Sequence, residues 1–90
     1  MKYRSRPRLV LDVLRAVQIE RQASVTRIMS VANISHPRLM EYLEELRGKG
    51  WLAESGEEGR RTWRLTEAGE AALHRLAEIE RSMDDFGLPL

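Results

Sequence analysis

Basic side chains are the best candidates for a functional site in this chain. Together with one hydroxyl and one imidazole they form three groups: Lys2, Arg4 and Arg6; Ser35, His36 and Arg38; Arg60, Arg61 and Arg64. Arginine and lysine bind phosphate oxygens, and an arginine can donate two hydrogen bonds to the edge of guanine. A protonated histidine donates from both ring nitrogens. The three groups therefore indicate contacts with a polyanion.

The sequence contains no comparable pattern for catalysis or metal binding. The chain has no cysteine, and its two histidines, His36 and His74, lie far apart in the sequence. It lacks a glycine-rich phosphate loop, a metal-ligand cluster and a serine, histidine and acid arrangement. We expect no enzyme and no metal or other cofactor, and no small-molecule ligand is evident.

The composition is that of a small globular domain. Of the 90 residues, 42% are hydrophobic and 32% are charged, as in ordinary soluble proteins. No run of about 18 apolar residues could span a membrane, and the start, MKYRSRPR, lacks the apolar part of a secretion signal. Because cysteine is absent as well, we expect one domain in the cytoplasm with no membrane partner.

Charge is unevenly distributed along the chain. Residues 1–38 carry eight Lys and Arg side chains against two acidic ones, whereas residues 39–90 carry seven against twelve, although the net charge is only +1. A basic face could bind a polyanion while the acidic part stays in solvent or meets another protein. An ordinary uneven surface charge is the alternative interpretation.

The first half of the chain predicts three helices, of which the second and third form a helix-turn-helix. Apolar residues on one helical face predict the first helix over about 8–22. The residues that cap, turn or end the next two helices are Ser24, Asn33, Ser35, Pro37, Gly48 and Gly50. Serine caps free amides, asparagine tolerates a left-handed turn, proline suits a first turn and glycine ends a helix.

The second half predicts a β-hairpin and a last helix. Alternating side chains over 51–54 and 60–65 flank a loop that contains glycine, as in a hairpin. Thr66 can then cap a helix, and Glu67 and Glu70 favour its N-terminus. The expected fold is therefore a winged helix-turn-helix, mainly α with a small β-hairpin (α+β).

The last helix carries an apolar stripe whose members recur at alternating intervals of four and three: Ala72, Leu76, Ile79, Met83 and Phe86. This spacing is typical of a coiled-coil seam, so the stripe predicts the interface of a homodimer. Leu73 lies off the seam and can anchor the helix to its own domain. Alternatively, the stripe packs on the chain's own core.

The ordered motifs resemble the small archaeal winged-helix DNA-binding proteins that have a C-terminal coiled-coil dimerisation helix. The resemblance spans about residues 8–83 and is carried by Thr26-Arg27-Ile28-Met29, Ala32-Asn33-Ile34-Ser35, Tyr42-Leu43, Leu46, Gly50, Leu65-Thr66-Glu67-Ala68-Gly69-Glu70 and Leu73. It implies a dimer that binds duplex DNA as a transcriptional regulator or chromatin protein, with the dimer helix at 65–83. The expected divisions are a basic arm at 1–7, the winged domain at 8–65, the C-terminal helix at 66–86 and a tail at 87–90.

On this fold the start of the second helix of the helix-turn-helix enters the major groove. Ser35, His36 and Arg38 would then lie nearest the base edges. Phosphate contacts are expected from Arg27, from the hairpin residues Arg60, Arg61 and Arg64, and from Lys2, Arg4 and Arg6 of the arm, which could also enter a minor groove. The glutamates Glu41, Glu44 and Glu45 weigh against base reading by this helix, because phosphates would repel them.

The expected function is that of a dimeric, nucleoid-associated protein that binds double-stranded DNA mainly through phosphates. It would act as a transcriptional regulator or a chromatin-organising protein. The alternative is a winged-helix module that binds another protein through its acidic helix and does not touch DNA, because one fold serves both purposes.

Overall fold

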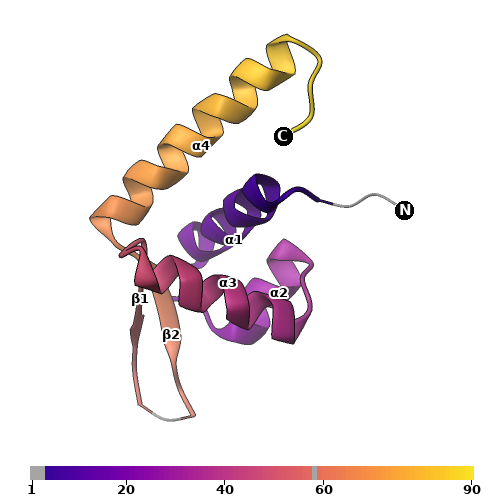
Figure 1. Ribbon diagram of the computed structural model, residues 1–90. Coiled ribbons are helices and arrows are strands. Elements are labelled where there is room, and N and C mark those ends of the chain that lie inside the picture. Colours follow the sequence, from indigo (N-terminus) through magenta and orange to yellow (C-terminus); the bar gives the residue numbers. More distant parts are fainter. Residues whose placement is uncertain (1–3, 58) are drawn as a thin grey trace.

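The computed structural model describes residues 4–57 and 59–90. Over these residues the chain forms helices and one hairpin with the following bounds (Figure 1): α1 Arg6–Glu20, α2 Val25–Ala32, α3 His36–Gly48, β1 Leu52–Ser55, β2 Thr62–Leu65 and α4 Glu67–Asp85. This order confirms the predicted winged helix, mainly α with a small β-hairpin.

Helix α1 begins and ends earlier than its apolar pattern predicted. Ser5 stands at its N-cap, where Oγ accepts the amide of Arg8 at 3.2 Å, and Pro7 occupies the first turn. At the other end Arg21 adopts a φ of 63°, which stops the helix. Because capping and backbone conformation set both ends, Arg6 belongs to α1 and not to an arm.

Helices α2 and α3 meet in the predicted turn. The Oγ of Ser24 accepts the amide of Arg27 at 3.1 Å, and Asn33 adopts the left-handed conformation with a φ of 53°. Ser35 stands at the N-cap of α3, but the prediction that its side chain caps the helix is wrong, since it accepts no such hydrogen bond. The first amides of α3 are therefore left to solvent.

The hairpin is tied to the helices through its second strand. Strands β1 and β2 pair antiparallel, with Leu52 opposite Leu65. Trp63 of β2 also pairs with Ala23, just before α2, through two backbone hydrogen bonds of 2.8 Å. The Trp63 side chain is 1% exposed, so the base of the wing is part of the core.

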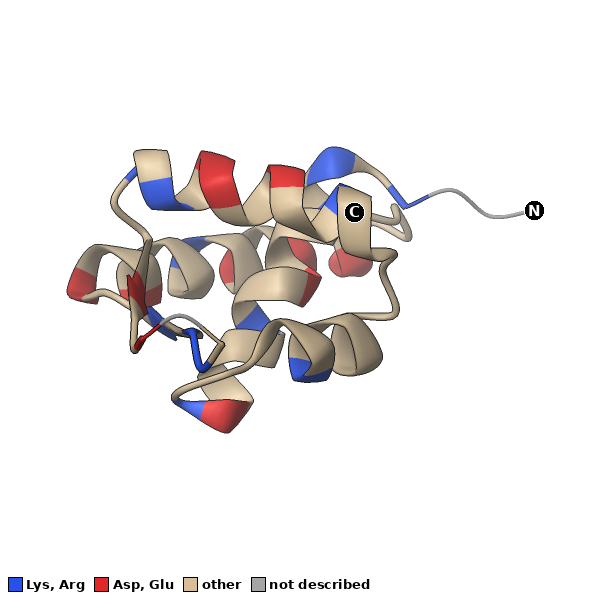
Figure 2. Ribbon diagram, turned by 90° about the horizontal axis from the view of Figure 1, so that it is seen from below, with Lys and Arg blue, Asp and Glu red and all other residues tan. Residues whose placement is uncertain are grey.

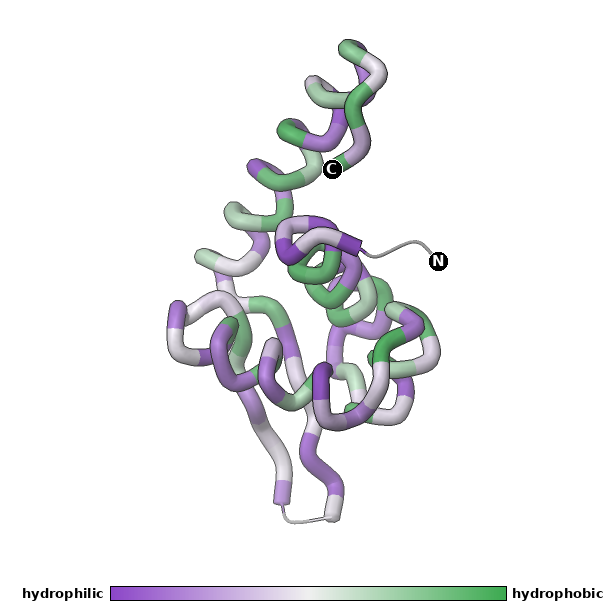
Figure 3. The backbone as a smooth tube through the Cα atoms, turned by 45° about the vertical axis from the view of Figure 1, so that its right-hand side comes forward, coloured by the Kyte–Doolittle hydropathy of each residue, from purple (hydrophilic) through white to green (hydrophobic). Residues whose placement is uncertain are grey.

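The core surrounds α1. Its members come from every helix and both strands: Leu9, Leu11, Val13, Leu14, Ala16, Val17, Ala23, Ile28, Ala32, Ile34, Leu39, Tyr42, Leu43, Leu46, Leu52, Trp63 and Leu73. Figure 3 shows the hydrophobic residues of α1 at the centre of the molecule. Burial of these side chains is the main force that holds α2, α3 and the hairpin in place.

The start of α4 docks tightly on the beginning of the hairpin. Thr66 Oγ1 accepts the amide of Gly69 at 3.0 Å and donates to the Gly50 carbonyl at 2.5 Å. A Cβ atom at Gly69 would lie 1.9 Å from the carbonyl oxygen of Trp51. Only glycine permits this approach. Leu73 is buried one turn later, which confirms the predicted anchor.

The predicted apolar seam of α4 is divided between two environments. Ala72 is 2% exposed and Leu76 packs against the core, so Ala72 is covered by its own chain and is not free for a second copy. Further along, Ile79 is 49% exposed and Phe86 is 81% exposed. Glu80 of this second half still pairs with Arg8 of α1, and the end of α4 beyond it extends away from the other helices (Figure 1).

Candidate nucleic-acid interface

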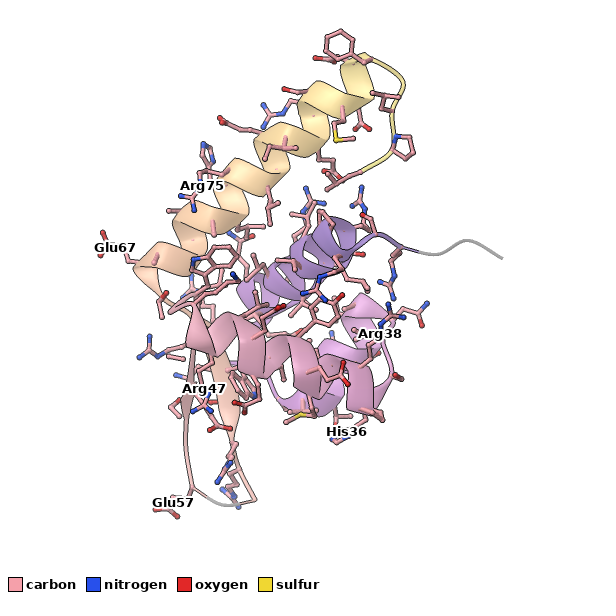
Figure 4. All side chains as sticks on the ribbon, viewed as in Figure 1. His36, Arg38, Arg47, Glu57, Glu67 and Arg75 are labelled. Atoms are coloured by element: carbon pink, nitrogen blue, oxygen red, sulfur yellow. The ribbon has the colours of Figure 1, made fainter. Side chains whose placement is uncertain are left out.

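The start of α3 presents its polar residues to solvent. Ser35, His36 and Arg38 are all exposed, and within the described residues Arg38 forms no ion pair. His36 lies on the lower edge of the molecule, the side toward which the hairpin extends (Figure 4). The helix-turn-helix therefore presents the three residues that the sequence assigned to base contacts.

Two of the three glutamates of α3 are neutralised by arginines. Glu45 accepts two hydrogen bonds from Arg6 of α1, at 2.7 and 2.8 Å. Glu44 pairs with Arg47, and this hydrogen bond raises the pKa of the arginine. Glu41 is exposed and forms no ion pair with the part of the chain that the structure describes. Repulsion of phosphates by α3 is thus concentrated in one side chain.

The basic arm is largely part of the fold. Arg4 pairs with Asp12 at 3.1 Å and donates hydrogen bonds to the carbonyls of Ala32 and Asn33. Arg6 pairs with Glu45 and also lies over the ring of Tyr42, with its guanidinium carbon 5.3 Å from the ring centroid. The fold thus holds the guanidinium group of Arg4 through a carboxylate and two carbonyls, whereas the pair of Arg6 is an exposed one, with 67% of that arginine's side chain exposed. Contact of either arginine with DNA stays a prediction, but both belong to the folded domain and not to a flexible arm. Lys2 lies outside the described residues.

The other arginines predicted to bind phosphate differ in whether they form ion pairs with carboxylates. Arg27 pairs with Glu20 at 2.7 Å, and Arg61 lies 3.5 Å from Glu54 across the hairpin. Both arginines are well exposed, and exposed pairs of this kind contribute only about 0 to 1 kcal/mol. A phosphate could therefore replace either carboxylate.

Arg60 and Arg64 are exposed, and neither forms an ion pair within residues 4–57 and 59–90. Glu57 lies at the tip of the hairpin, as Figure 4 shows. Arg64 lies on β2, whereas Arg60 lies in the loop before it, where its amide donates to the Glu57 carbonyl at 2.8 Å. Positive charge on the wing is therefore carried by the side of the hairpin that returns to the core, and Arg60 places part of it close to Glu57.

Seen from the side of the hairpin tip, residues of both signs are interspersed over the molecule (Figure 2). Sequence reasoning missed Arg47, which lies beside the hairpin (Figure 4). It follows His36 by about three helical turns and so shares its side of α3. That spacing could have identified Arg47 as a candidate for DNA contact, but the sequence did not show that this side of α3 faces the wing.

Other kinds of site find no support in the described residues. They contain no group of three or more His, Cys, Asp or Glu side chains that could hold a metal ion. His74 pairs with Glu78 at 3.2 Å on the surface of α4. None of the described helices is long and apolar enough to cross a membrane.

Three helices, a hairpin that returns to the core through β2 and an exposed α3 start define a winged helix-turn-helix protein. The model of the winged helix-turn-helix family matches residues 3–84. The chain belongs to this family. A comparison with curated protein sequences found no match.

Solved structures share the fold. The DNA-binding protein Sso10a-2 from Sulfolobus solfataricus superposes with a TM-score of 0.84 at 24% identity, over 92% of this chain and 85% of that one. BpsR from Bordetella bronchiseptica, whose DNA binding is regulated by 6-hydroxynicotinic acid, gives 0.79 at 18% identity, over 86% of this chain and 57% of that one. The multiple antibiotic resistance repressor MarR gives 0.70 at 18% identity, over 78% and 53%. This chain thus spans little more than half of the last two proteins.

Proposed function

We propose that this chain is a dimeric protein that binds double-stranded DNA, mainly through phosphates, as a transcriptional regulator or an organiser of the nucleoid. The observation that carries the proposal is the exposed start of α3, where Arg38 has no ion-pair partner among the described residues, together with a wing at the other end of α3 whose Arg60 and Arg64 have none either. DNA-binding proteins with the same fold support it.

Each exposed residue has a distinct role in this proposal. Arg38 and His36 contact base edges in the major groove, and Ser35 donates to a nearby phosphate or base. Arg60 and Arg64 bind phosphates. Arg27, Arg61 and Arg47 do so by exchanging their carboxylate partners for phosphate, and Lys2 adds to this attraction. Phosphate contacts position the protein and carry no sequence information.

The proposed dimer forms through the second half of α4. Ile79, Met83 and Phe86 continue a coiled-coil spacing, and two of the three are about half exposed or more. Two such stripes could bury each other in an antiparallel pair. Leu76 lies at the point where the stripe leaves the core, so it would contact both its own domain and the partner copy.

Binding to another protein is the second candidate function, and Glu41 is the observation that favours it. This exposed carboxylate lies one turn after Arg38 on α3 and lines a shallow hollow with Arg6, Tyr42 and Glu45. A basic partner would bind it, whereas phosphates would not.

Salt-dependent binding separates the two functions. Fluorescence anisotropy with a pool of random duplexes should show affinity that falls with salt, at a log-log slope near −0.9 for each phosphate neutralised. Five contacted phosphates would give a slope of about −4.5. The absence of measurable binding at about 50 mM salt, a condition in which phosphate contacts are strong, would contradict the proposal and leave the protein-binding module.

A further inference from the structure

A connected series of charged side chains begins at the turn of the helix-turn-helix. The guanidinium group of Arg4 binds the carbonyls of Ala32 and Asn33, at the end of α2, and also Asp12 of α1 at 3.1 Å. Asp12 pairs next with Arg8, one turn before it on α1, at 3.5 Å. The end of α2 is therefore held to α1 by charge as well as by the core.

The same series continues from α1 to α4. Arg8 also pairs with Glu80 at 2.5 Å, and Glu80 pairs with Arg15 at 2.8 Å. We call these five side chains the α1 network: Arg4, Asp12, Arg8, Glu80 and Arg15. Each carboxylate lies between two arginines, so the network joins the helix-turn-helix to α4 without a break.

The two carboxylates of the network are the least exposed among the ion-paired aspartates and glutamates described above. The side chains of Glu80 and Asp12 are 17% and 23% exposed, against 25% for Glu54, 28% for Glu20, 40% for Glu45 and 54% for Glu44. The hydrogen bond from Arg15 lowers the pKa of Glu80, and Arg8 lowers it further. Shielded charges interact more strongly than exposed ones, so Glu80 in particular is held by its two arginines.

The position of the network in the fold indicates what it controls. The start of α4 is fixed by the hairpin and by Leu73, but the stripe beyond Leu76 leaves the core. Glu80 lies in this second half of the helix and ties it to two arginines of α1. Leu90, in the tail after α4, also packs against the core, but the ion-pair network is the contact that joins the helix itself to α1 and to the turn before α3. The direction of the proposed dimer helix therefore depends on this network.

We propose that the α1 network sets the angle between α4 and the helix-turn-helix, and thereby the spacing at which two copies place their α3 helices on DNA. The inference rests on the proposed dimeric DNA-binding function. Asp12, Arg8 and Glu80 act as positioning residues, because they reach DNA only through the elements that they hold. In a dimer the separation of the two recognition helices fixes the half-site spacing.

A spin-label distance measurement tests the angle directly. The chain lacks cysteine, so Ser30→Cys on α2 and Ser82→Cys on α4 give two unique labels at exposed positions. Labelled protein is diluted with unlabelled protein so that distances within one chain dominate. Glu80→Gln and Asp12→Asn each remove one carboxylate, and with it two ion pairs of the network, while conserving shape. Glu20→Gln is the matched control, because it removes an α1 to α2 ion pair outside the network.

The expected result follows because the ion pairs connect α2, α1 and α4 one after another, so the loss of either carboxylate interrupts the whole connection. Glu80→Gln and Asp12→Asn should each widen the distance distribution by about twofold, and the double variant should be no wider than either single variant, since neighbours in one network are not additive. Glu20→Gln should leave the width unchanged. Unchanged widths in both network variants, or additive widening in the double variant, would overturn the inference. Circular dichroism checks that each variant is folded.

A selection from random duplexes separates this inference from the function on which it rests. The wild-type chain should recover sites with one half-site spacing, and Glu80→Gln should recover several spacings with similar affinity for each half-site. If wild type selects no duplex, the proposed function fails, and the inferred role in spacing fails with it. If wild type selects sites and Glu80→Gln selects the same spacing, only the role of the network is refuted.

Discussion

Replacing Gly69 by alanine isolates the contact that docks α4 on the hairpin. The added Cβ would lie 1.9 Å from the carbonyl oxygen of Trp51 and 2.8 Å from its carbonyl carbon. These are backbone atoms, so the helix must shift, at a cost typical of overpacking, roughly 1–3 kcal/mol. Alanine normally stabilises a helix by about 1 kcal/mol relative to glycine. The opposing effects should leave Gly69→Ala less stable by up to about 2 kcal/mol.

Gly48→Ala is the matched control, because this helical glycine has no atom within 4 Å of an added Cβ. It should raise the free energy of unfolding by up to about 1 kcal/mol. Urea unfolding followed by circular dichroism, at one fixed protein concentration, measures both variants. Each kcal/mol should correspond to roughly 4–8 °C in Tm for a domain of this size. A Gly69→Ala variant as stable as Gly48→Ala would show that α4 does not dock as described.

Three other predictions concern DNA reading, dimerisation and pH. Arg38→Ala should weaken preferred duplexes about tenfold more than random ones, whereas Arg61→Ala should weaken both alike in anisotropy titrations; equal losses would mean that Arg38 only positions the protein. Ile79→Glu combined with Phe86→Glu should halve the mass measured by light scattering, because both side chains are exposed on the proposed dimer stripe; an unchanged dimer mass would place the interface elsewhere. Glu80→Gln should lower the free energy of unfolding by about 1 kcal/mol at pH 7. Since the pKa of Glu80 is lowered in the fold, its contribution is complete above the ordinary value of 4.5 and is lost as pH falls through the lower folded value. A difference from wild type that persists undiminished at about pH 2 would contradict this linkage.

The structure changes the meaning of the acidic α3 helix. From the sequence alone its three glutamates weigh against base reading by this helix. In the fold Arg6 neutralises Glu45, and Arg47 neutralises Glu44. Glu41→Gln therefore isolates the one carboxylate of α3 without an ion pair in the described residues, and its effect on duplex affinity would show how closely that side of the helix approaches DNA.

Local patterns predicted most of the fold. The cap at Ser24, the left-handed Asn33 and the cap at Thr66 were identified correctly, because these signals depend on residues a few positions apart. The start of α1 was placed too late, since Ser5 and Pro7 set it while the apolar stripe begins further on. Ser35 was expected to cap α3 and does not.

The sequence predicts the order of helices and strands, the apolar faces that form the core and the exposed residues at the start of α3. Which charged side chains have no ion-pair partner among the described residues is a property of the tertiary structure. Arg4 and Arg6 are engaged because Asp12 and Glu45 lie beside them in space, and Ala72 is buried because α4 docks at Gly69. Helical and strand periodicity are local properties of the chain, whereas an ion pair depends on distances between elements that packing alone sets.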